Sequence, residues 1–349
     1  MRKNDTHPRL LLKVSYLFYR LGLSHTDIAT RLGLSRFQVA RLLRMALDAE
    51  YVRVTILEPE RWHADLERDL EARFGLTAAI VVDNDHLDDD EIKRRVADAA
   101  GRYLVETLDD GDVLGVSLGS TIQDLVNQLP YHIDKRVEVV QLIGGSSGEQ
   151  PDVSPSILTA QLAQRFRTRP FLLHAPAVVG DGQLRRSLLA DSTIQATYAR
   201  YQALTVAVLG IGALTHGTTS RLLYGGVIDA TLLRTILDRG AVGDILAYVY
   251  RLDGSLVASS LDDRMVAIPL PDLLRVRRRV GIVAGPAKVP AVLGALRGGF
   301  ITVLVTDSST AQAIKDANVT QDEAAHRADG DPVERGADER LLVGMKENE

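Results

Sequence analysis

Short apolar segments alternate with helical patterns over residues 76–316, and this alternation restricts the possible fold more than any other feature of the chain. The near-continuous apolar runs that we predict to be strands are Ala79–Val82, Asp112–Ser117, Val137–Ile143, Pro170–His174, Leu204–Gly210, Ile245–Tyr250, Met265–Ile268, Val280–Ala284 and Ile301–Val305. Helical patterns occupy most of the gaps, at residues 89–108, 120–128, 154–166, 183–201, 228–238, 271–278, 287–297 and 308–316. Strands of this kind separated by helices favour a mostly parallel sheet with helices on both faces. We therefore predict a large Rossmann-like α/β domain over residues 76–317.

The N-terminal segment has a different pattern, in which apolar residues recur at helical spacing in three short stretches. The first stretch covers Leu10–Leu21. The second begins after Ser24 and ends at Gly33, and the third begins after Ser35, since serine is a preferred cap at helix starts. Two short helices joined by a turn in which Gly33 can adopt a positive φ form a helix-turn-helix pattern.

One face of the predicted third helix carries side chains that suit a DNA-binding helix. At 100° per residue, Phe37, Arg41 and Arg44 fall between about 80° and 140° from Arg36, opposite the apolar residues of this helix. Arginine binds guanine edges and phosphates, glutamine can bind adenine, and a helix fits the major groove. An ordinary three-helix domain with a solvated charged face is the alternative. The residues that we predict to contact DNA are Thr26, Ser35, Arg36, Phe37, Gln38, Arg41 and Arg44.

The distribution of charge favours DNA binding by the head. The whole chain has a formal net charge of −5, but residues 1–56 contain ten Lys and Arg against four Asp and Glu. The net charge is thus +6 for this segment and −11 for the rest. A basic head on an acidic body indicates that the head alone binds a polyanion.

A short strand and a helix are predicted between the two domains. Residues 51–57 alternate and are rich in β-branched side chains, which predicts a strand, either a small wing or the end of a DNA-binding domain over residues 1–57. Four apolar residues recur at every fourth position of the linker at residues 58–75: Trp62, Leu66, Leu70 and Phe74. Such a helix either packs on its own domain or pairs with its copy in a dimer.

Two turns at the carboxyl ends of predicted strands are rich in small residues and hydrogen-bond donors. Leu118–Thr121 follows the second predicted strand, and Gly144–Gly148 follows the third. Open α/β sheets bind ligands at this edge, and the backbone N–H groups of such turns can bind phosphate or sugar hydroxyls. The alternative is that each segment is only a turn, as Gly/Ser strand-to-helix turns usually are. Neither matches the dinucleotide-binding fingerprint or the P-loop pattern, so we expect no nucleotide cofactor.

Two charged residues stand beside these turns. Lys288 begins a predicted helix, where a cation is unfavourable unless an anion is bound as well, so it is a candidate phosphate ligand. Asp244 precedes the predicted strand Ile245–Tyr250 and is a candidate acceptor for sugar hydroxyls. A surface lysine and a turn aspartate are the alternative interpretation. The predicted effector-binding residues are Gly119, Ser120, Thr121, Gly144, Gly145, Ser146, Ser147, Asp244 and Lys288.

Missing residue types and spacings argue against several kinds of function. Without cysteine the chain has no disulfide, thiolate metal site or cysteine nucleophile, which fits a cytoplasmic protein. No apolar run approaches the roughly 20 residues of a membrane span. The histidines lack metal-ligand spacing, and His174 is more typical of a core edge than of a catalytic site. We predict no metal, no cofactor and no membrane partner, and a disordered acidic tail over residues 318–349.

The chain resembles the SorC/DeoR-type sugar-responsive transcriptional regulators of bacteria up to about residue 316. The stretches that carry the resemblance are DIATRLGLSRFQVARLLRMA, GVSLGST, QLIGGSSG, GAVGDILAYVY and VGIVAGPAKVPAVLGALRGGFITVLVTD. The sequence departs from the family pattern in two places. Leu118 stands where members commonly have tryptophan, and Ser146 and Ser147 stand where a Gly-Gly-Thr run is frequent.

This resemblance implies a winged helix-turn-helix head and a body similar to the sugar-phosphate isomerase and CoA-transferase superfamily. It also implies a homodimer or homotetramer whose binding to operator DNA is controlled by a phosphorylated sugar or polyol. The family's effector site would use Ser120, Thr121, the Gly144–Ser147 loop, Asp244 and Lys288. We therefore predict a transcriptional regulator of a carbohydrate operon and not an enzyme.

Two other functions are alternatives. A sugar-phosphate isomerase or lyase with an accessory DNA-binding head would need an acid–base pair, of which only Asp244 is a candidate. A structural DNA-binding protein without a ligand would leave the donor-rich turns at the strand ends unexplained.

Overall fold

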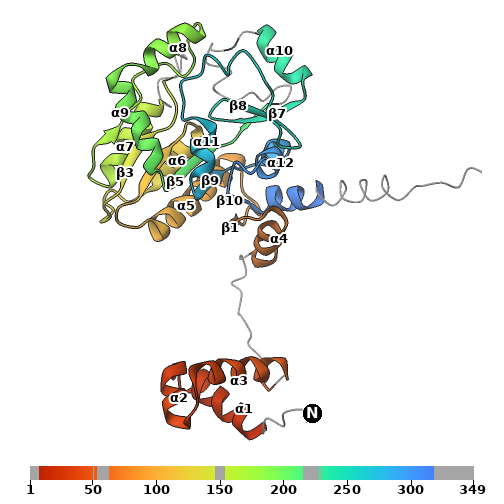
Figure 1. Cartoon of the computed structure of the whole chain (residues 1–349). Coiled ribbons are helices and arrows are strands. Elements are labelled where there is room, and N and C mark those ends of the chain that lie inside the picture. The colour runs from red at the N-terminus through yellow and green to blue at the C-terminus, as the bar shows by residue number, and fades with distance from the viewer. Residues whose placement is uncertain are drawn as a thin grey trace, which may run out of the picture. The chain divides into compact units, whose positions relative to one another are not determined.

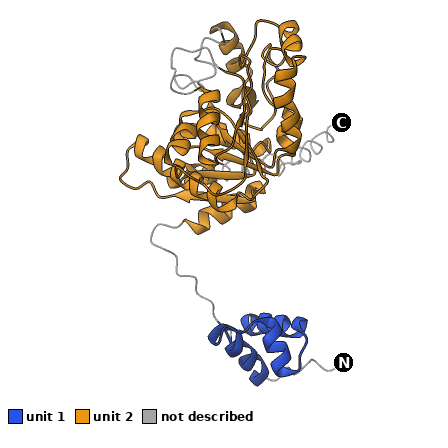
Figure 2. Ribbon diagram, turned by 90° about the vertical axis from the view of Figure 1, so that its left-hand side faces the viewer, with its two compact units in different colours: residues 1–59 blue, residues 60–349 orange. Residues whose placement is uncertain are grey.

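The chain divides into two compact units, Met1–Pro59 and Glu60–Glu349 (Figure 2). This division comes from a computed structural model, which describes residues 8–49, 51–52, 63–145, 154–214, 228 and 230–317. Each unit has a hydrophobic core of its own. The predicted acidic tail and the predicted Tyr51–Leu57 strand beyond Val52 lie outside the described residues, and Tyr51 and Val52 themselves are not in a strand.

Unit 1 is a bundle of short helices. They are α1 (Pro8–Ser15), a π-helical turn η1 (Tyr16–Arg20), α2 (His25–Leu32) and α3 (Arg36–Asp48). Gly33 ends α2 at φ +66°, in the left-handed region that favours glycine, and only three residues then separate α2 from α3. Ile28, Val39 and Ala46 are fully buried between the helices. The predicted helix-turn-helix is confirmed in its elements.

Unit 2 is built on a seven-stranded sheet in the order β1-β10-β9-β5-β2-β3-β4. Figure 1 labels β1, β10, β9, β5 and β3 of this sheet. Its strands are β1 (Ala78–Val82), β2 (Val113–Val116), β3 (Glu138–Gln141), β4 (Pro170–Phe171), β5 (Val206–Gly210), β9 (Arg278–Ile282) and β10 (Val303–Asp307). Every neighbouring pair is parallel. The predicted parallel α/β fold is therefore confirmed.

Helices cover both faces of this sheet. Successive residues of a strand point to opposite faces and therefore pack in different hydrophobic cores. Leu114 and Val206 pack with α5 (Asp89–Thr107), α6 (Ser120–Gln128) and α7 (Pro155–Arg165). Val113 and Ala207 pack in a second core with residues of α4, α11, α12 and the helical residues 308–317. The remaining helices have the bounds α4 (Ala64–Phe74), α8 (Gly182–Leu189), α9 (Ser192–Arg200), α10 (Ala230–Asp238), α11 (Leu270–Arg275) and α12 (Val289–Arg297), with single turns η3 (Tyr201–Ala203) and η5 (Pro286–Lys288).

A small antiparallel sheet, in the order β6-β7-β8, corrects the predicted strand Ile245–Tyr250. Its strands are β6 (Gly212–Ala213), β7 (Ala241–Ile245) and β8 (Tyr248–Arg251). The apolar run is interrupted by a two-residue turn, Leu246-Ala247, in which both residues have positive φ, 53° and 68°. Such turns are usually marked by Asn-Gly, so an apolar turn gives no sequence signal.

Two further predictions about elements are wrong. Residues 265–268 form only single bridges, Val178 with Met265 and Ile143 with Ala267, and do not make a strand. The predicted helix at 183–201 is two helices, because Asp191 accepts a hydrogen bond from the N–H of Thr193 and thereby caps α9. In contrast, the predicted helices at 89–108, 120–128 and 154–166 are confirmed, with ends that differ by no more than one residue.

The helix α4 covers the outer edge of the sheet at β1. Its Glu71 and Glu67 side chains each accept a hydrogen bond of 2.8 Å from a backbone N–H of β1, at Ala79 and Val81 respectively. Leu70 is fully buried, and Leu66 and Phe74 pack against the same core. The predicted apolar strip is therefore used within unit 2, while Trp62 lies outside the described residues.

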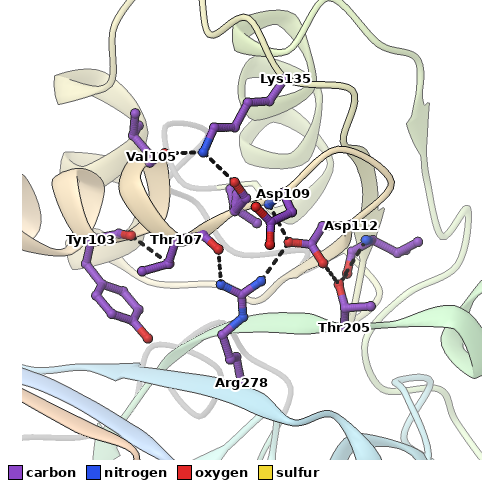
Figure 3. Close-up of polar contacts among 10 residues, drawn as sticks. Tyr103, Val105, Thr107, Asp109, Asp112, Lys135, Thr205 and Arg278 are labelled. Atoms are coloured by element: carbon purple, nitrogen blue, oxygen red, sulfur yellow. Dashed lines mark hydrogen bonds and ion pairs between the residues drawn. The ribbon is translucent and has the colours of Figure 1, made fainter. Parts of the chain in front are cut away.

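At the amino ends of the central strands, a polar cluster joins β2, β5 and β9 (Figure 3). The Asp112 carboxylate accepts hydrogen bonds from Arg278 Nη2 (2.6 Å), Thr205 Oγ1 (2.7 Å) and the N–H of Asp109 (2.8 Å). Arg278 also donates to the carbonyl oxygen of Thr107 at the end of α5. This cluster fixes the edge of the sheet opposite to the one at which parallel α/β sheets bind ligands.

Candidate functional site

A cavity of about 350 Å³ lies at the carboxyl ends of the strands β2, β5 and β9. The chain leaves β2 toward β3 and β4 on one side, whereas β5, β9 and β10 lie on its other side. The order of strands therefore reverses between β2 and β5. Open α/β sheets bind ligands at such a switch point.

The turn after β2 places hydrogen-bond donors at this cavity. Gly119 precedes α6 at φ +151°, and no side chain caps the first turn of this helix. Gly119, Ser120 and Thr121, three of the predicted effector-binding residues, all line the cavity. The neighbouring strand end is tied in by a hydrogen bond of 2.9 Å from the N–H of Gly210 to Ser117 Oγ. An uncapped helix start with two hydroxyl side chains can bind an anion.

Lys288 lines the same cavity from the loop after β9. It is the last residue of η5 and the residue before α12, where no side-chain cap is formed. The loop begins at Gly285, whose φ of +95° is in the left-handed region. Lys288 and the start of α6 thus reach the cavity from two separate strand ends. An ammonium group and two helix starts make this part of the cavity suited to a negatively charged ligand.

Asp244 lines the cavity from the small sheet. It lies within β7, and not before a strand as predicted, and its side chain is only 3% exposed. Its Oδ2 accepts a hydrogen bond of 3.2 Å from the N–H of Ala247 across the positive-φ turn. Burial raises the pKa of the neighbouring Tyr250 well above its usual value, with a further contribution from Asp244, so this phenol stays neutral. A buried carboxylate in a cavity wall is a strong acceptor for hydroxyl groups.

The predicted loop after β3 is only partly described. Gly144 and Gly145 do not line the cavity; the N–H of Gly145 donates to the carbonyl oxygen of Ala175, and that of Gly144 to Val266. A Cβ on Gly144 would lie 2.6 Å from the carbonyl oxygen of Ala175, so this glycine permits a close backbone approach. Ser146 and Ser147 lie outside the described residues.

Sequence reasoning missed several residues that line the cavity. The segment Gly210–Ala213 begins at the last residue of β5 and continues through β6, and the strand-end rule that selected the other two turns would also have found it. Asp89 and Lys93 reach the cavity from the first turns of α5, and Leu246 from the β7–β8 turn. Nothing in the local sequence marks Asp89 and Lys93, because α5 follows β1 at the far edge of the sheet and only folding brings it here.

Within the described residues, no group of three His, Asp or Glu side chains could hold a metal ion. His174 is exposed and does not line the cavity. Nor does any helix in the described part of the chain have the length and apolar character needed to cross a membrane.

In unit 1, the predicted DNA-contacting face is exposed. Thr26 of α2 and Arg36 of α3 are open to solvent, as are Phe37, Arg41 and Arg44, which lie opposite the buried residues of α3. Ser35 and Gln38 are exposed as well, but they also form a reciprocal capping box. The N–H of Ser35 donates to Gln38 Oε1 (2.8 Å), and the N–H of Gln38 donates to Ser35 Oγ (3.2 Å). Gln38 therefore stabilises the start of the helix, and a contact of Gln38 with adenine stays a prediction.

A helix-turn-helix in one unit and a switch-point ligand cavity in the other define a ligand-responsive DNA-binding regulator as the class of protein. Comparison with known proteins agrees. Residues 61–314 match the family model Sugar-bind, described as "Putative sugar-binding domain". Transcriptional regulator YjhU of Escherichia coli (strain K12) is 32% identical over 86% of this chain and 93% of its own length.

Two further relatives extend the comparison. The deoxyribonucleoside regulator of Bacillus subtilis (strain 168) is 30% identical over 88% of this chain and 97% of its own. The crystal structure of the full-length sorbitol operon regulator SorC from Klebsiella pneumoniae is 27% identical, with a TM-score of 0.67 over 87% of this chain and 97% of that one. The chain belongs to this sugar-binding-domain family of SorC/DeoR-type transcriptional regulators. It is a sugar-responsive transcriptional regulator and not an enzyme.

Proposed function

We propose that the chain binds operator DNA of a carbohydrate operon, and that a phosphorylated sugar or polyol in the strand-end cavity controls this binding. The observation that carries the proposal is the composition of the cavity wall. Lys288 and the uncapped start of α6 supply positive charge and N–H donors, whereas buried Asp244 supplies a hydroxyl acceptor from another element. A molecule with a phosphate at one end and hydroxyls at the other matches both.

In this proposal the residues have separate roles. The backbone N–H groups after Gly119 and the hydroxyls of Ser120 and Thr121 donate to phosphate oxygens, and Lys288 offsets the phosphate charge. Asp244 is anionic, so it accepts hydrogen bonds from sugar hydroxyls and stays away from the phosphate. The cavity volume of about 350 Å³ suits a small ligand of this kind.

The test is calorimetric titration of the full chain with a panel of sugar phosphates and polyol phosphates, each paired with its dephosphorylated form. We expect Lys288→Ala to weaken the phosphorylated ligand about 10- to 150-fold, because a charge-assisted hydrogen bond is worth roughly 1.5–3 kcal/mol. It should barely affect the dephosphorylated form. Lys13→Ala, an exposed lysine of unit 1, is the matched control and should leave both affinities unchanged. Equal weakening of the two forms by Lys288→Ala would refute the phosphate role.

Asp244→Ala separates the sugar end of the ligand from the phosphate end. We expect this variant to bind phosphorylated epimers with similar affinities, because it loses a hydroxyl acceptor and keeps the phosphate contacts. An unchanged preference among epimers would contradict the role of Asp244.

The DNA-binding role is tested on α3. If Arg41 or Arg44 makes a bidentate base contact, its replacement by alanine should cost about 1–3 kcal/mol and relax specificity at one base pair. Binding of operator by residues 60–349 as tightly as by the full chain would show that the assignment is wrong.

We infer further that the protein works as a homodimer or homotetramer in the cytoplasm, since two heads are needed to bind two half-sites on DNA. Light scattering of the full chain measures the assembly. Because Leu70 is fully buried within unit 2, replacing it with glutamate would test folding and not assembly.

A further inference from the structure

Phe37 is the most exposed large apolar side chain among the described residues of unit 1. Its side chain is 90% exposed, whereas the other exposed apolar residues of this unit reach at most 58%, at Tyr16. It is the second residue of α3 and lies at the helix start that faces away from the core. Exposing a phenyl ring to water costs free energy in proportion to its apolar area, so burying the Phe37 ring against a partner would be favourable.

The surface around Phe37 indicates what covers it. Phe37, Ala40, Arg41 and Arg44 are spaced i, i+3, i+4 and i+7 along α3, and all four are exposed. They therefore form one stripe on the helix, which we call the Phe37 stripe. Two of its four members are arginines, and Arg36 stands beside Phe37. The charge of this stripe is complementary to the DNA backbone and unfavourable for a second copy of the same surface.

The helix cap leaves Phe37 as a base-contacting candidate at this end of α3. Gln38 is held toward Ser35 by the reciprocal cap, whereas Phe37 makes no contact of that kind. The small side chain of Ala40 lets the next turn of the helix approach the floor of a groove. In the major groove the apolar group that distinguishes the base pairs is the C5-methyl of thymine, and phenylalanine is one of the side chains that contact it.

We propose that Phe37 contacts a thymine methyl in each half-site and thereby specifies a T·A pair that no arginine of α3 reads. This inference rests on the proposed function, since it requires α3 to lie in the major groove. It assigns an apolar, methyl-dependent component to the sequence specificity of this protein. The arginines of the Phe37 stripe would contact guanine bases and phosphates, whereas Phe37 would recognise one base pair through the thymine methyl and without a hydrogen bond.

The experiment begins with selection of bound sites from randomised duplexes by the full-length protein. Each thymine of the selected duplex is then replaced in turn by 2′-deoxyuridine, which removes only the methyl group. We expect one thymine in each half-site at which this replacement weakens binding about fourfold, because one buried methyl is worth roughly 0.8 kcal/mol. The same replacement by 2′-deoxyuridine at the remaining thymines should have little effect.

Variants then assign the methyl to Phe37. Phe37→Ala should weaken binding of the thymine duplex about tenfold and abolish the thymine-to-uracil difference at that position. Arg44→Ala is the matched control on the same stripe: it should weaken binding to both duplexes equally and keep the difference. If the alanine variant binds too weakly to measure, Phe37→Leu is used instead. Its ratio of affinities for the thymine and the uracil duplex should lie between the wild-type ratio and one.

The outcomes separate this inference from the proposed function. If no duplex is selected, DNA binding itself fails. If the wild type binds a selected duplex but tolerates uracil at every position, DNA binding stands and the role of Phe37 is wrong. A thymine-to-uracil difference that survives in both Phe37 variants also overturns the inference. So does a Phe37→Ala protein whose mass in light scattering falls while the difference persists, because Phe37 would then contact another protomer and not the DNA.

Discussion

The carboxylate of Asp307 accepts a hydrogen bond of 2.9 Å from the backbone N–H of Gly285, and this bond joins the end of β10 to the loop that leads to Lys288. The same carboxylate accepts hydrogen bonds from the N–H (2.9 Å) and hydroxyl (2.7 Å) of Thr310 and from Asn84 Nδ2 (3.0 Å). Asp307 is fully buried. Its position is therefore set by several neighbours, and it in turn fixes the loop at the cavity.

Asp307→Ala should weaken binding of the phosphorylated effector although Asp307 does not line the cavity. The loop from Gly285 would lose its anchor, and a displaced Lys288 forfeits part of its charge-assisted bond, so we expect a loss of about tenfold. Asp307→Asn keeps an oxygen acceptor and should restore part of the affinity. Titration of both variants is the measurement, and Asp110→Ala, at an exposed site outside the cavity, is the control. Unchanged affinity in Asp307→Ala would refute the positioning role.

The stability of the protein should fall in acid through Asp307 and Asp112. Burial opposes ionisation of each carboxyl, but the hydrogen bonds from Gly285 and Thr310 to one, and from Asp109, Thr205 and Arg278 to the other, hold both pKa values below their usual range. A lowered folded-state pKa stabilises the folded state above the unfolded pKa of about 3.9, and this contribution is lost as the pH falls through the folded value. The free energy of unfolding, measured by urea titration, should therefore decrease below about pH 4. The Asp112→Asn variant should show a shallower decrease, and an equally steep one would contradict this cause.

Arg278→Met should lower the free energy of unfolding by about 2 kcal/mol, because it leaves the partly buried Asp112 carboxylate without its charged donor. The side chains of Arg278 and Asp112 are only 22% and 12% exposed. Arg136→Met is the matched control: Arg136 pairs with Asp110 at 2.9 Å, but the two side chains are 88% and 51% exposed, so no measurable change is expected. Urea denaturation with a constant m-value gives the comparison. Equal effects of the two substitutions would show that burial does not decide the contribution.

Removal of the two carboxylates that cover the edge of β1 should promote self-association. In Glu67→Ala/Glu71→Ala the N–H groups of Ala79 and Val81 lose their acceptors, and an uncovered edge strand can pair with another chain. Glu67→Gln/Glu71→Gln retains an oxygen acceptor at each position and should behave like the wild type. Sedimentation velocity at several concentrations measures the association. A double alanine variant that sediments like the glutamine variant would contradict this role for α4.

Ala247→Gly should raise the free energy of unfolding by about 0.5–1 kcal/mol. Ala247 has a φ of 68°, a backbone conformation that is strained for a residue with a Cβ and not for glycine. Glycine also raises the entropy of the unfolded chain, which offsets part of the gain in stability. Ala196→Gly, at an exposed position of the helix α9, is the control and should lower the same free energy by about 1 kcal/mol. Thermal and urea denaturation measure the change in the free energy of unfolding of both variants, including its sign. A loss of stability in Ala247→Gly would show that the turn is not strained.

Local sequence signals predicted most elements because each depends on neighbours within one or two turns of the chain. Ser24-x-x-Asp27 and Ser35-x-x-Gln38 are capping boxes that can be read directly, and both form. The second one could also have shown that Gln38 serves the helix start. By contrast, the Leu246-Ala247 turn carries no local signal, so the hairpin was predicted as one strand.

The sequence by itself determined the alternation of strands and helices, the basic head and the small-residue turns that follow β2 and β3. Only the tertiary structure decided which of these turns share a cavity: the turn after β2 meets Lys288 and Asp244, whereas Gly144 and Gly145 pair with the backbone near Ala175. It also decided that Leu70 packs inside its own unit. The physical reason is that the period of apolar residues reports burial along one element, whereas the order of strands depends on the packing of both sheet faces by residues far apart in the chain.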